Sequence, residues 1–235
     1  MVYFKDININ NIFIKISKKL KDDGELISPR GLKTLELQHT WIELLNPLKS
    51  IITLKERKLN KTYLKKELKW YKSGDLKIDY IKQYSSFWEK LSDSNGTVNS
   101  NYGFLALIQK FNGKSQYEWC LNSLKKDKNS RQAIINYNQP IHKYKNNKDY
   151  VCTIAQSFII RNNFLDSIVF MRSNDLIYGF SYDVPWFCLL MKYMAKDLGI
   201  RLGTYRHYTT SMHVYEKHFN MINKINNNIK YVSIN

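Results

Sequence analysis

The segments VCTIAQSFIIRN (residues 151–162) and FLDSIVFMRS (residues 164–173) stand in the second half of the chain and contain its most strand-like sequence. Both carry the apolar and β-branched residues that are typical of β-strands. The first segment also carries Cys152, one of only three cysteines. Because a lone cysteine usually packs as a small hydrophobic residue, this stretch alone does not make Cys152 a nucleophile.

Segments on either side predict an α+β fold. Further strands are expected in GLKTLELQHTWIELL (31–45), RQAIINYN (131–138) and RLGTYRHYTTSMHVY (201–215). Helices are expected in LNKTYLKKELKWYKSG (59–74), SQYEWCLNSLKKD (115–127), VPWFCLLMKYMAKDLG (184–199) and HVYEKHFNMINKIN (213–226). Residues 3–20 fit a short helix or a strand, and SDSNGTVNSNYG (92–103) is a loop. With no repeat or linker visible, we expect a single domain over residues 1–235.

The chain has 235 residues and a net charge of +17, from 37 Lys and Arg against 20 Asp and Glu. Such a charge attracts anions, among them nucleic acids, phosphorylated metabolites and polyglutamates. The lysines are scattered, and heavy use of Lys, Asn and Ile is also what AT-rich coding produces. Since no zinc-finger, helix-turn-helix or RNA-recognition signature is present, we expect no dedicated nucleic-acid partner.

Location and metal content follow from two further patterns. No run of about 18 apolar residues is present, and the N-terminus lacks the cationic start and apolar block of a signal peptide. We therefore expect no membrane association and a cytoplasmic location, in the host cytoplasm if a phage encodes the protein. The three cysteines form no CxxC pair, which argues against a disulfide framework and a structural zinc site. No metal is expected.

Six short strings occur in a recognisable order. They are KELKWYKSGD (66–75), NSNYG (99–103), NSRQAI (129–134), VCT (151–153), MRSNDLIYGFSYD (171–183) and HVYEKH (213–218). Together they resemble the thymidylate synthase superfamily, and more closely its bacteriophage branch of deoxycytidylate hydroxymethylases, over about residues 28–220. The resemblance implies a thymidylate synthase-like fold, a mixed β-sheet with flanking helices.

In this context Cys152 becomes the expected nucleophile. Thiolate addition at C6 of a pyrimidine converts C5 into a carbon that can attack a one-carbon donor, and the addition is reversible. A thiolate needs nearby positive charge, for which Arg172 is the candidate. Cys120 and Cys188 lie on apolar helix faces and are expected to pack in the core.

The phosphate of a nucleotide carries about two negative charges and favours arginine and hydroxyl donors. The resemblance implies that Arg172 and Ser173 bind it, and that Arg131 reaches the phosphate of the partner subunit in a homodimer. The family usually has a second arginine after Arg131, whereas this chain has Gln132. Arg30 is a candidate substitute for another phosphate arginine; the alternative is an ordinary turn residue.

The sugar, the proton transfers and the folate involve other residues. His213 and Tyr215 are two apart, so on an extended segment they face the same way, and the resemblance implies that they bind the ribose 3′-hydroxyl. It assigns Glu67 to proton transfer and water ordering; the alternative is a solvated partner of nearby lysines. Trp88 and Tyr102 match folate-site residues and could equally be core aromatic residues. The other histidines are expected to be ordinary core or surface residues (His39, His142, His207, His218).

Asp183 discriminates between the pyrimidine bases. Thymidylate synthases have an asparagine here, whose amide suits uracil N3–H and O4. A carboxyl group instead accepts from cytosine N4–H and shares a proton with N3, and leaving such groups unpaired costs about 1–3 kcal/mol. The alternative is a cap on the following helix. By resemblance, Asp175 contacts the pterin or the base edge, and Gly179 lets the backbone approach the base.

The expected reaction converts dCMP, 5,10-methylenetetrahydrofolate and water into 5-hydroxymethyl-dCMP and tetrahydrofolate. Methyl-forming relatives carry a C-terminal tail that excludes water, and no such tail is recognised in NKINNNIKYVSIN (223–235). Viruses mark their DNA with this product, so a phage origin is plausible. The alternatives are methylation of dUMP or dCMP, hydroxymethylation of CMP, and a basic nucleic-acid-binding protein on a degenerate enzyme fold.

Overall fold

The computed structural model describes residues 1–232 of the chain. Residues 233–235, the end of the stretch in which no tail was recognised, lie outside the described residues. The chain forms two compact units. The first unit comprises residues 1–59, 166–192 and the chain from 202 onward, and the second comprises residues 60–165 and 193–201.

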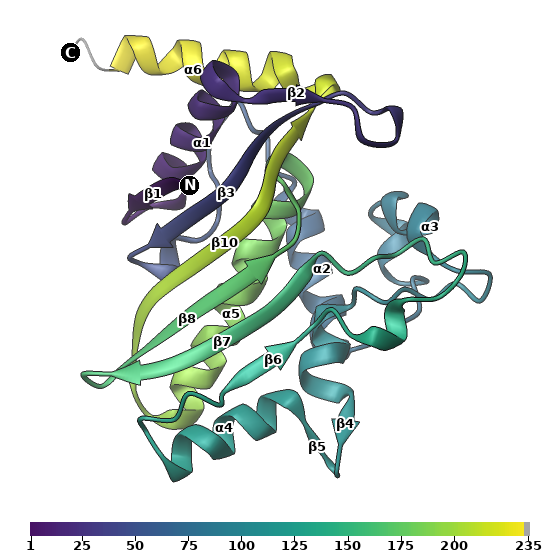
Figure 1. Cartoon of the computed structure of the whole chain (residues 1–235), viewed down its shortest axis with the longest axis vertical. Coiled ribbons are helices and arrows are strands. Elements are labelled where there is room, and N and C mark those ends of the chain that lie inside the picture. Colours follow the sequence, from purple (N-terminus) through teal and green to yellow (C-terminus); the bar gives the residue numbers. More distant parts are fainter. Residues whose placement is uncertain (233–235) are drawn as a thin grey trace. The chain divides into compact units, whose positions relative to one another are not determined.

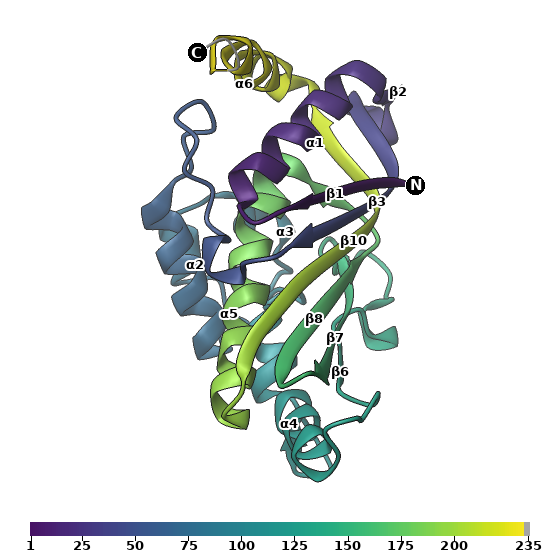
Figure 2. The same ribbon diagram turned by 90° about the vertical axis from the view of Figure 1, so that its left-hand side faces the viewer.

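The first unit is a sheet with a helix along one face. Strand β3 (Thr34–Leu44) runs parallel to β1 (Val2–Asp6) and antiparallel to β10 (Arg201–Tyr215) and β2 (Glu25–Ile27). The two-residue strand β9 (Asn174–Asp175) pairs with β10 in parallel, and β8 (Phe164–Met171) precedes it. Helix α1 (Ile9–Asp23) lies along β1 and β3, and α6 (Phe219–Val232) packs on α1 (Figures 1 and 2).

Helix α1 follows directly from its sequence. The Asn8 side chain accepts a hydrogen bond from the Asn10 N–H at 2.9 Å, which satisfies one open donor of the first turn. Apolar residues then recur at helical spacing, so that Ile9, Ile12 and Phe13 are buried. Residues 3–20 therefore contain a strand followed by a helix, and the sequence alone left these two choices open.

The second unit contains α2 (Lys61–Ser73), α3 (Phe87–Leu91), α4 (Gln116–Lys126) and the antiparallel pair β6 (Ile134–Asn136) and β7 (Thr153–Arg161). A small hairpin joins β4 (Lys110–Phe111) to β5 (Lys114–Ser115). Asn60 caps the start of α2, and Gly74 ends it in the left-handed conformation at φ 63°, as the sequence predicted. Helix α5 (Ser181–Leu198) has residues in both units and ends before Gly199.

Single turns complete the described chain. Five are 3₁₀ turns, at Pro29–Gly31, Pro47–Lys49, Ile81–Gln83, Pro140–His142 and Glu216–His218, and π-helical turns occupy Phe104–Ile108 and Leu176–Phe180. Within residues 1–232, no helix is both long enough and apolar enough to cross a lipid bilayer.

Most of the predicted elements are confirmed, and two have different bounds. The strand expected over residues 131–138 is only Ile134–Asn136, because the backbone turns at Ser130 and Gln132. The final helix does not begin at His213: residues 213–215 belong to β10, since Tyr215 is paired with Thr34 of β3. The α+β class is confirmed, with strands and helices in both units.

Candidate active site

The segment between β8 and α5 gathers several of the predicted residues in the first unit. Arg172 is exposed at the end of β8, Ser173 is half-buried, and β9 follows. The Asp175 Oδ1 accepts from the Ile177 N–H at 2.8 Å, which starts the π-helical turn Leu176–Phe180. This turn carries the chain directly into α5, whose third residue is Asp183.

Asn174 and Asp183 are brought together by that turn. The Asn174 Nδ2 donates to the Asp183 Oδ2 at 2.8 Å, and both side chains are buried. A Cβ atom at Gly179 would lie 2.6 Å from the Asn174 Nδ2 and 3.2 Å from the Asp183 Oδ2. Glycine is therefore required at position 179 for this hydrogen bond, a local reason that the sequence did not reveal.

Burial controls the protonation of Asp183. Its side chain loses hydration in the interior, which raises its pKa to about 7; the Asn174 hydrogen bond lowers the pKa, and the negative charge of Asp175 raises it further. The carboxyl group therefore exchanges its proton near neutral pH. The helix-cap interpretation of Asp183 is wrong, because α5 begins two residues earlier and the carboxyl oxygen accepts from a side chain.

Arg57 forms hydrogen bonds to the turn Leu176–Phe180 and to the first residue of α5, and sequence reasoning missed it. The residue is only 5% exposed, although it stands among exposed lysines in the string LKERK. The Nε donates to the Ser181 Oγ at 3.1 Å, and an Nη donates to the Ile177 carbonyl oxygen at 2.6 Å. Nothing local distinguishes a buried arginine from its exposed neighbours in such a string.

His213 and Tyr215 lie beside this segment on β10. The parallel pairing of β9 and β10 sets His213 opposite Asp175. The His213 and Tyr215 rings meet edge to face, with centroids 5.3 Å apart, which confirms that they face the same way. Burial raises the pKa of Asp175, against the lowering effects of the Ile177 N–H and of His213. Arg30 lies in the exposed turn Pro29–Gly31, at φ 53°.

Glu67 occupies a buried polar chain in the second unit. Its side chain is on α2 and the residue is 4% exposed. The Trp88 Nε1 donates to the Tyr63 hydroxyl at 2.9 Å, and the Tyr63 hydroxyl donates to the Glu67 Oε1 at 2.5 Å. The solvated-partner interpretation of Glu67 is therefore wrong. Sequence reasoning missed Tyr63, although its spacing of four residues from Glu67 on a helix was a usable signal.

Trp88 and Tyr102 belong to an aromatic cluster of the same unit. The Trp88 ring meets Trp70 with centroids 4.7 Å apart, and Tyr102 lies 5.4 Å from both Tyr71 and Tyr137. Both predicted residues are buried. They are thus core aromatic residues of the second unit, and their contact with a folate stays a prediction.

The three cysteines differ in exposure as the sequence suggested. Cys120 and Cys188 are buried, and burial raises the pKa of both thiols, that of Cys120 to about 12. Cys152 is half-buried, immediately before β7, with its sulfur 3.7 Å from the Tyr150 carbonyl oxygen. Arg131 is exposed, in the segment between α4 and β6.

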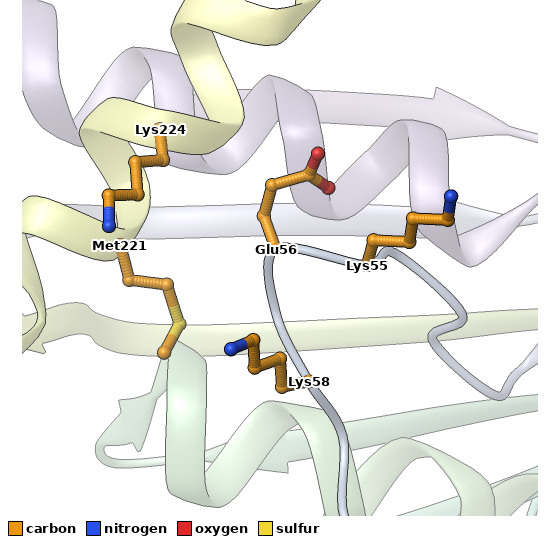
Figure 3. A pocket seen from close by; sticks show the side chains of 5 residues that line it. All are labelled: Lys55, Glu56, Lys58, Met221 and Lys224. Carbon is orange, nitrogen blue, oxygen red and sulfur yellow. The ribbon is translucent and has the colours of Figure 1, made fainter.

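A basic hollow of about 420 Å³ opens on the first unit. Lys55, Glu56 and Lys58 line it from the segment before α2, and Met221 and Lys224 line it from α6 (Figure 3). None of the predicted site residues lines this hollow. Within residues 1–232, no group of three or more His, Cys, Asp and Glu side chains is arranged to hold a metal ion.

This chain is similar in sequence to known proteins. The family model described as thymidylate synthase matches residues 11–232. The deoxycytidylate 5-hydroxymethyltransferase of Enterobacteria phage T4 is 29% identical over 229 residues, covering 92% of this chain and 89% of that protein. The deoxyuridylate hydroxymethyltransferase of Bacillus phage SP01 is 28% identical over 226 residues, covering 92% of this chain and 59% of that protein.

A solved structure shows the same fold. Thermostable thymidylate synthase A from Bacillus subtilis superposes with a TM-score of 0.76 at 20% identity, covering 93% of this chain and 84% of that one. The expected thymidylate synthase-like fold, a mixed sheet with flanking helices, is therefore confirmed.

Proposed function

The chain belongs to the thymidylate synthase family, and we propose that it is the member that hydroxymethylates C5 of dCMP. It is a one-carbon transferase, as are its named relatives. The substrates are dCMP, 5,10-methylenetetrahydrofolate and water, and the products are 5-hydroxymethyl-dCMP and tetrahydrofolate. Both phage relatives named above are hydroxymethyltransferases, which favours water over hydride as the final donor to the one-carbon unit.

The observation that carries the choice of base is the Asn174–Asp183 pair. Asp183 has a pKa of about 7, so its carboxyl group and cytosine N3 can share one proton. The Asn174 N–H fixes the orientation of the carboxyl group by donating to its Oδ2. One carboxyl oxygen then accepts from cytosine N4–H, while the shared proton joins the other oxygen to N3.

Uracil is the rival base, and the SP01 relative is named for deoxyuridylate. Uracil keeps its own proton on N3 and presents an acceptor at O4. An ionised Asp183 facing O4 would set acceptor against acceptor, at a cost of about 1–3 kcal/mol for each buried group left unpaired. The carboxyl group at position 183 therefore favours dCMP.

The other proposed roles are those that the resemblance to the family implies. Cys152 adds to C6, and Arg172 favours its thiolate and, with Ser173, Arg131 and Arg30, binds the phosphate. His213 and Tyr215 bind the sugar hydroxyl, and Gly179 lets the backbone approach the base. A single catalytic domain over residues 1–235 stays a prediction.

Methylenetetrahydrofolate, when bound, supplies the one-carbon unit. The residues suited to it are Glu67, Trp88, Tyr102 and Asp175. The fit rests on Glu67, whose buried carboxyl group accepts from the Tyr63 hydroxyl and can hold or move a proton out of contact with bulk water. The aromatic rings of Trp88 and Tyr102 suit a flat heterocycle.

Product analysis tests the proposal. The protein is incubated with dCMP, dUMP or CMP together with methylenetetrahydrofolate, and the nucleotides are identified by mass spectrometry while dihydrofolate is followed by absorbance. We expect hydroxymethyl-dCMP without dihydrofolate. Methylated product with dihydrofolate, or preferential modification of dUMP, would refute it. Cys152→Ser should abolish turnover, and full activity in that variant would remove Cys152 from the mechanism.

A further inference from the structure

The predicted nucleophile Cys152 stands at the end of an irregular segment of the second unit. Residues 147–152 belong to neither a helix nor a strand, and β7 begins only at Thr153. This stretch therefore lacks the regular hydrogen-bond ladder that fixes each residue of a strand. Side-chain hydrogen bonds hold it, and they come from residues to which the proposed function gives no role.

Asp149, three positions before Cys152, is the centre of these hydrogen bonds. Its Oδ2 accepts from the Ser100 N–H at 2.7 Å and from the Ser100 hydroxyl at 2.8 Å. The Asp149 carbonyl oxygen accepts from the Asn99 Nδ2 at 3.2 Å. Asp149 and Ser100 are only 5% and 8% exposed, so water cannot readily replace a partner that is lost.

Two further contacts fix the backbone next to Asp149. The Asn147 Oδ1 accepts from the Asp149 N–H at 2.8 Å. The Asn138 Nδ2 donates to the Val151 carbonyl oxygen at 2.8 Å. The chain is thus held by side chains at positions 149 and 151, directly before Cys152.

The string NSNYG (residues 99–103) is itself anchored to α2. The Asn101 Nδ2 donates to the carbonyl oxygen of Asp75, just beyond the end of that helix, at 2.9 Å. A Cβ atom at Gly103 would lie 1.5 Å from the Tyr71 carbonyl oxygen, so only glycine permits this close approach to α2. The string therefore joins the segment before the nucleophile to the helix that carries the predicted proton-transfer residue.

Asp149 is a buried carboxyl group without an ion-pair partner. Within residues 1–232, no side-chain nitrogen of Lys, Arg or His lies within 4.0 Å of its carboxyl oxygens. Burial raises the pKa of Asp149, against the lowering effect of the Ser100 donors. Burying a carboxyl group costs stability that an apolar residue would not cost, which favours a functional role for Asp149.

We propose that Asp149 and Ser100 are positioning residues for Cys152. Their hydrogen bonds fix the segment before the nucleophile against the string NSNYG, and through it against the helix that carries Glu67. The inference rests on the proposed function, because it takes Cys152 as the nucleophile. Position matters for this chemistry, since a reacting group misplaced by about 1 Å loses about 100-fold in rate. Neither residue touches the substrate, and both act through Cys152.

The test is Ser100→Ala in the full-length enzyme, with Asp149→Ala as the stronger variant. Ser100→Ala removes the hydroxyl hydrogen bond and keeps the one from the backbone N–H. We expect kcat on dCMP to fall about 10-fold in Ser100→Ala and about 100-fold in Asp149→Ala. The KM for dCMP should stay at the wild-type value, because the reacting thiol is displaced and the nucleotide contacts are not.

Alkylation by iodoacetamide reports the position of Cys152 without any substrate. Cys120 and Cys188 are buried and Cys152 is half-buried, and peptide mass spectrometry distinguishes the three thiols. Losing one hydrogen bond worth about 1 kcal/mol opens the segment about 5-fold more often, so Cys152 should react about 5-fold faster in Ser100→Ala. Equal acceleration at all three cysteines would show general loosening of the protein and would overturn the proposal.

Ser115→Ala is the matched control. Ser115 is a buried serine of the same unit, and its Oγ accepts from the Glu118 N–H at 3.2 Å as the N-cap of α4. Its replacement removes a comparable hydrogen bond and leaves the segment before Cys152 intact. Both kcat and the alkylation rate of Cys152 should equal those of the wild type, and changes as large as those of Ser100→Ala would contradict a specific role for Ser100.

The two readouts separate this inference from the proposed function. If the wild type does not convert dCMP but Ser100→Ala accelerates alkylation of Cys152, the proposed function fails and the hold on Cys152 stands. If the wild type converts dCMP and Ser100→Ala changes neither kcat nor alkylation, the positioning role fails and the proposed function stands. A fall in kcat without a change in the reactivity of Cys152 would also overturn the positioning role.

Discussion

Replacing Asp183 by asparagine should make the stability of the protein less sensitive to a rise from acidic to neutral pH. The pKa of Asp183 is raised from 3.8 to about 7, chiefly by burial. The folded state therefore holds this proton more tightly than the unfolded chain. The stability that Asp183 contributes is fully present below about pH 4 and is lost as the pH rises through about 7.

The magnitude follows from the size of the shift. Each pKa unit corresponds to about 1.4 kcal/mol, so a shift from 3.8 to about 7 corresponds to about 4 kcal/mol. The asparagine of the variant would be neutral at every pH and could still accept the Asn174 N–H that Asp183 accepts at 2.8 Å. The difference in unfolding free energy between Asp183→Asn and wild type should thus change by about 4 kcal/mol in favour of the variant between about pH 4 and about pH 8.

Urea unfolding of both proteins across this pH range measures the difference. Asp93→Asn is the control of opposite sign: hydrogen bonds, first from the Thr97 backbone, lower the pKa of Asp93, so its removal should cost more as the pH rises. A stability difference for Asp183→Asn that stays constant within about 1 kcal/mol, below the shift calculated above, would refute the assignment of a buried, proton-exchanging carboxyl group.

The same variant should change base preference. An amide at position 183 pairs with uracil N3–H and O4, so Asp183→Asn should gain activity on dUMP and lose activity on dCMP. One buried mismatch of about 1–3 kcal/mol corresponds to a shift of about 5-fold to 150-fold in the ratio of kcat/KM values. Competition between the two nucleotides measures this ratio, and an unchanged preference for dCMP would exclude Asp183 from base recognition.

Three further variants probe the surroundings of the site. Gly179→Ala adds a Cβ 2.6 Å from the Asn174 Nδ2, so it should cost about 1–3 kcal/mol in urea unfolding and weaken dCMP preference; an unchanged unfolding midpoint would contradict this. Tyr63→Phe removes the hydroxyl that donates to Glu67 and should lower kcat about 10-fold to 100-fold in steady-state assays, whereas a wild-type kcat would show that this hydrogen bond does not assist proton transfer by Glu67. Arg57→Lys cannot keep both hydrogen bonds, to the Ser181 hydroxyl and the Ile177 carbonyl oxygen, and should lower the unfolding free energy by about 1–3 kcal/mol, measured by urea unfolding. An unfolding free energy equal to that of the wild type would show that these two hydrogen bonds do not stabilise the turn.

Several features were determined by the sequence alone because their causes are local. Gly74 ends α2 and Gly199 follows the end of α5, since glycine adopts the left-handed conformation without a steric penalty. Apolar spacing on α4 and α5 identified Cys120 and Cys188 as core residues. The order of six short strings was sufficient to identify the family, because each string sits at a fixed place in a shared fold.

Other features depend on neighbours that are distant in sequence, and only the tertiary structure decided them. Strand β10 continues to Tyr215 because it pairs with β3 as far as that residue, although the sequence pattern predicted a helix from residue 213. Arg57 is buried because the turn at Ile177 and Ser181 folds against it, 120 and 124 positions away. The pKa of Asp183 is set by burial and by Asn174 and Asp175. Burial and desolvation depend on the path of the whole chain, so no local pattern encodes them.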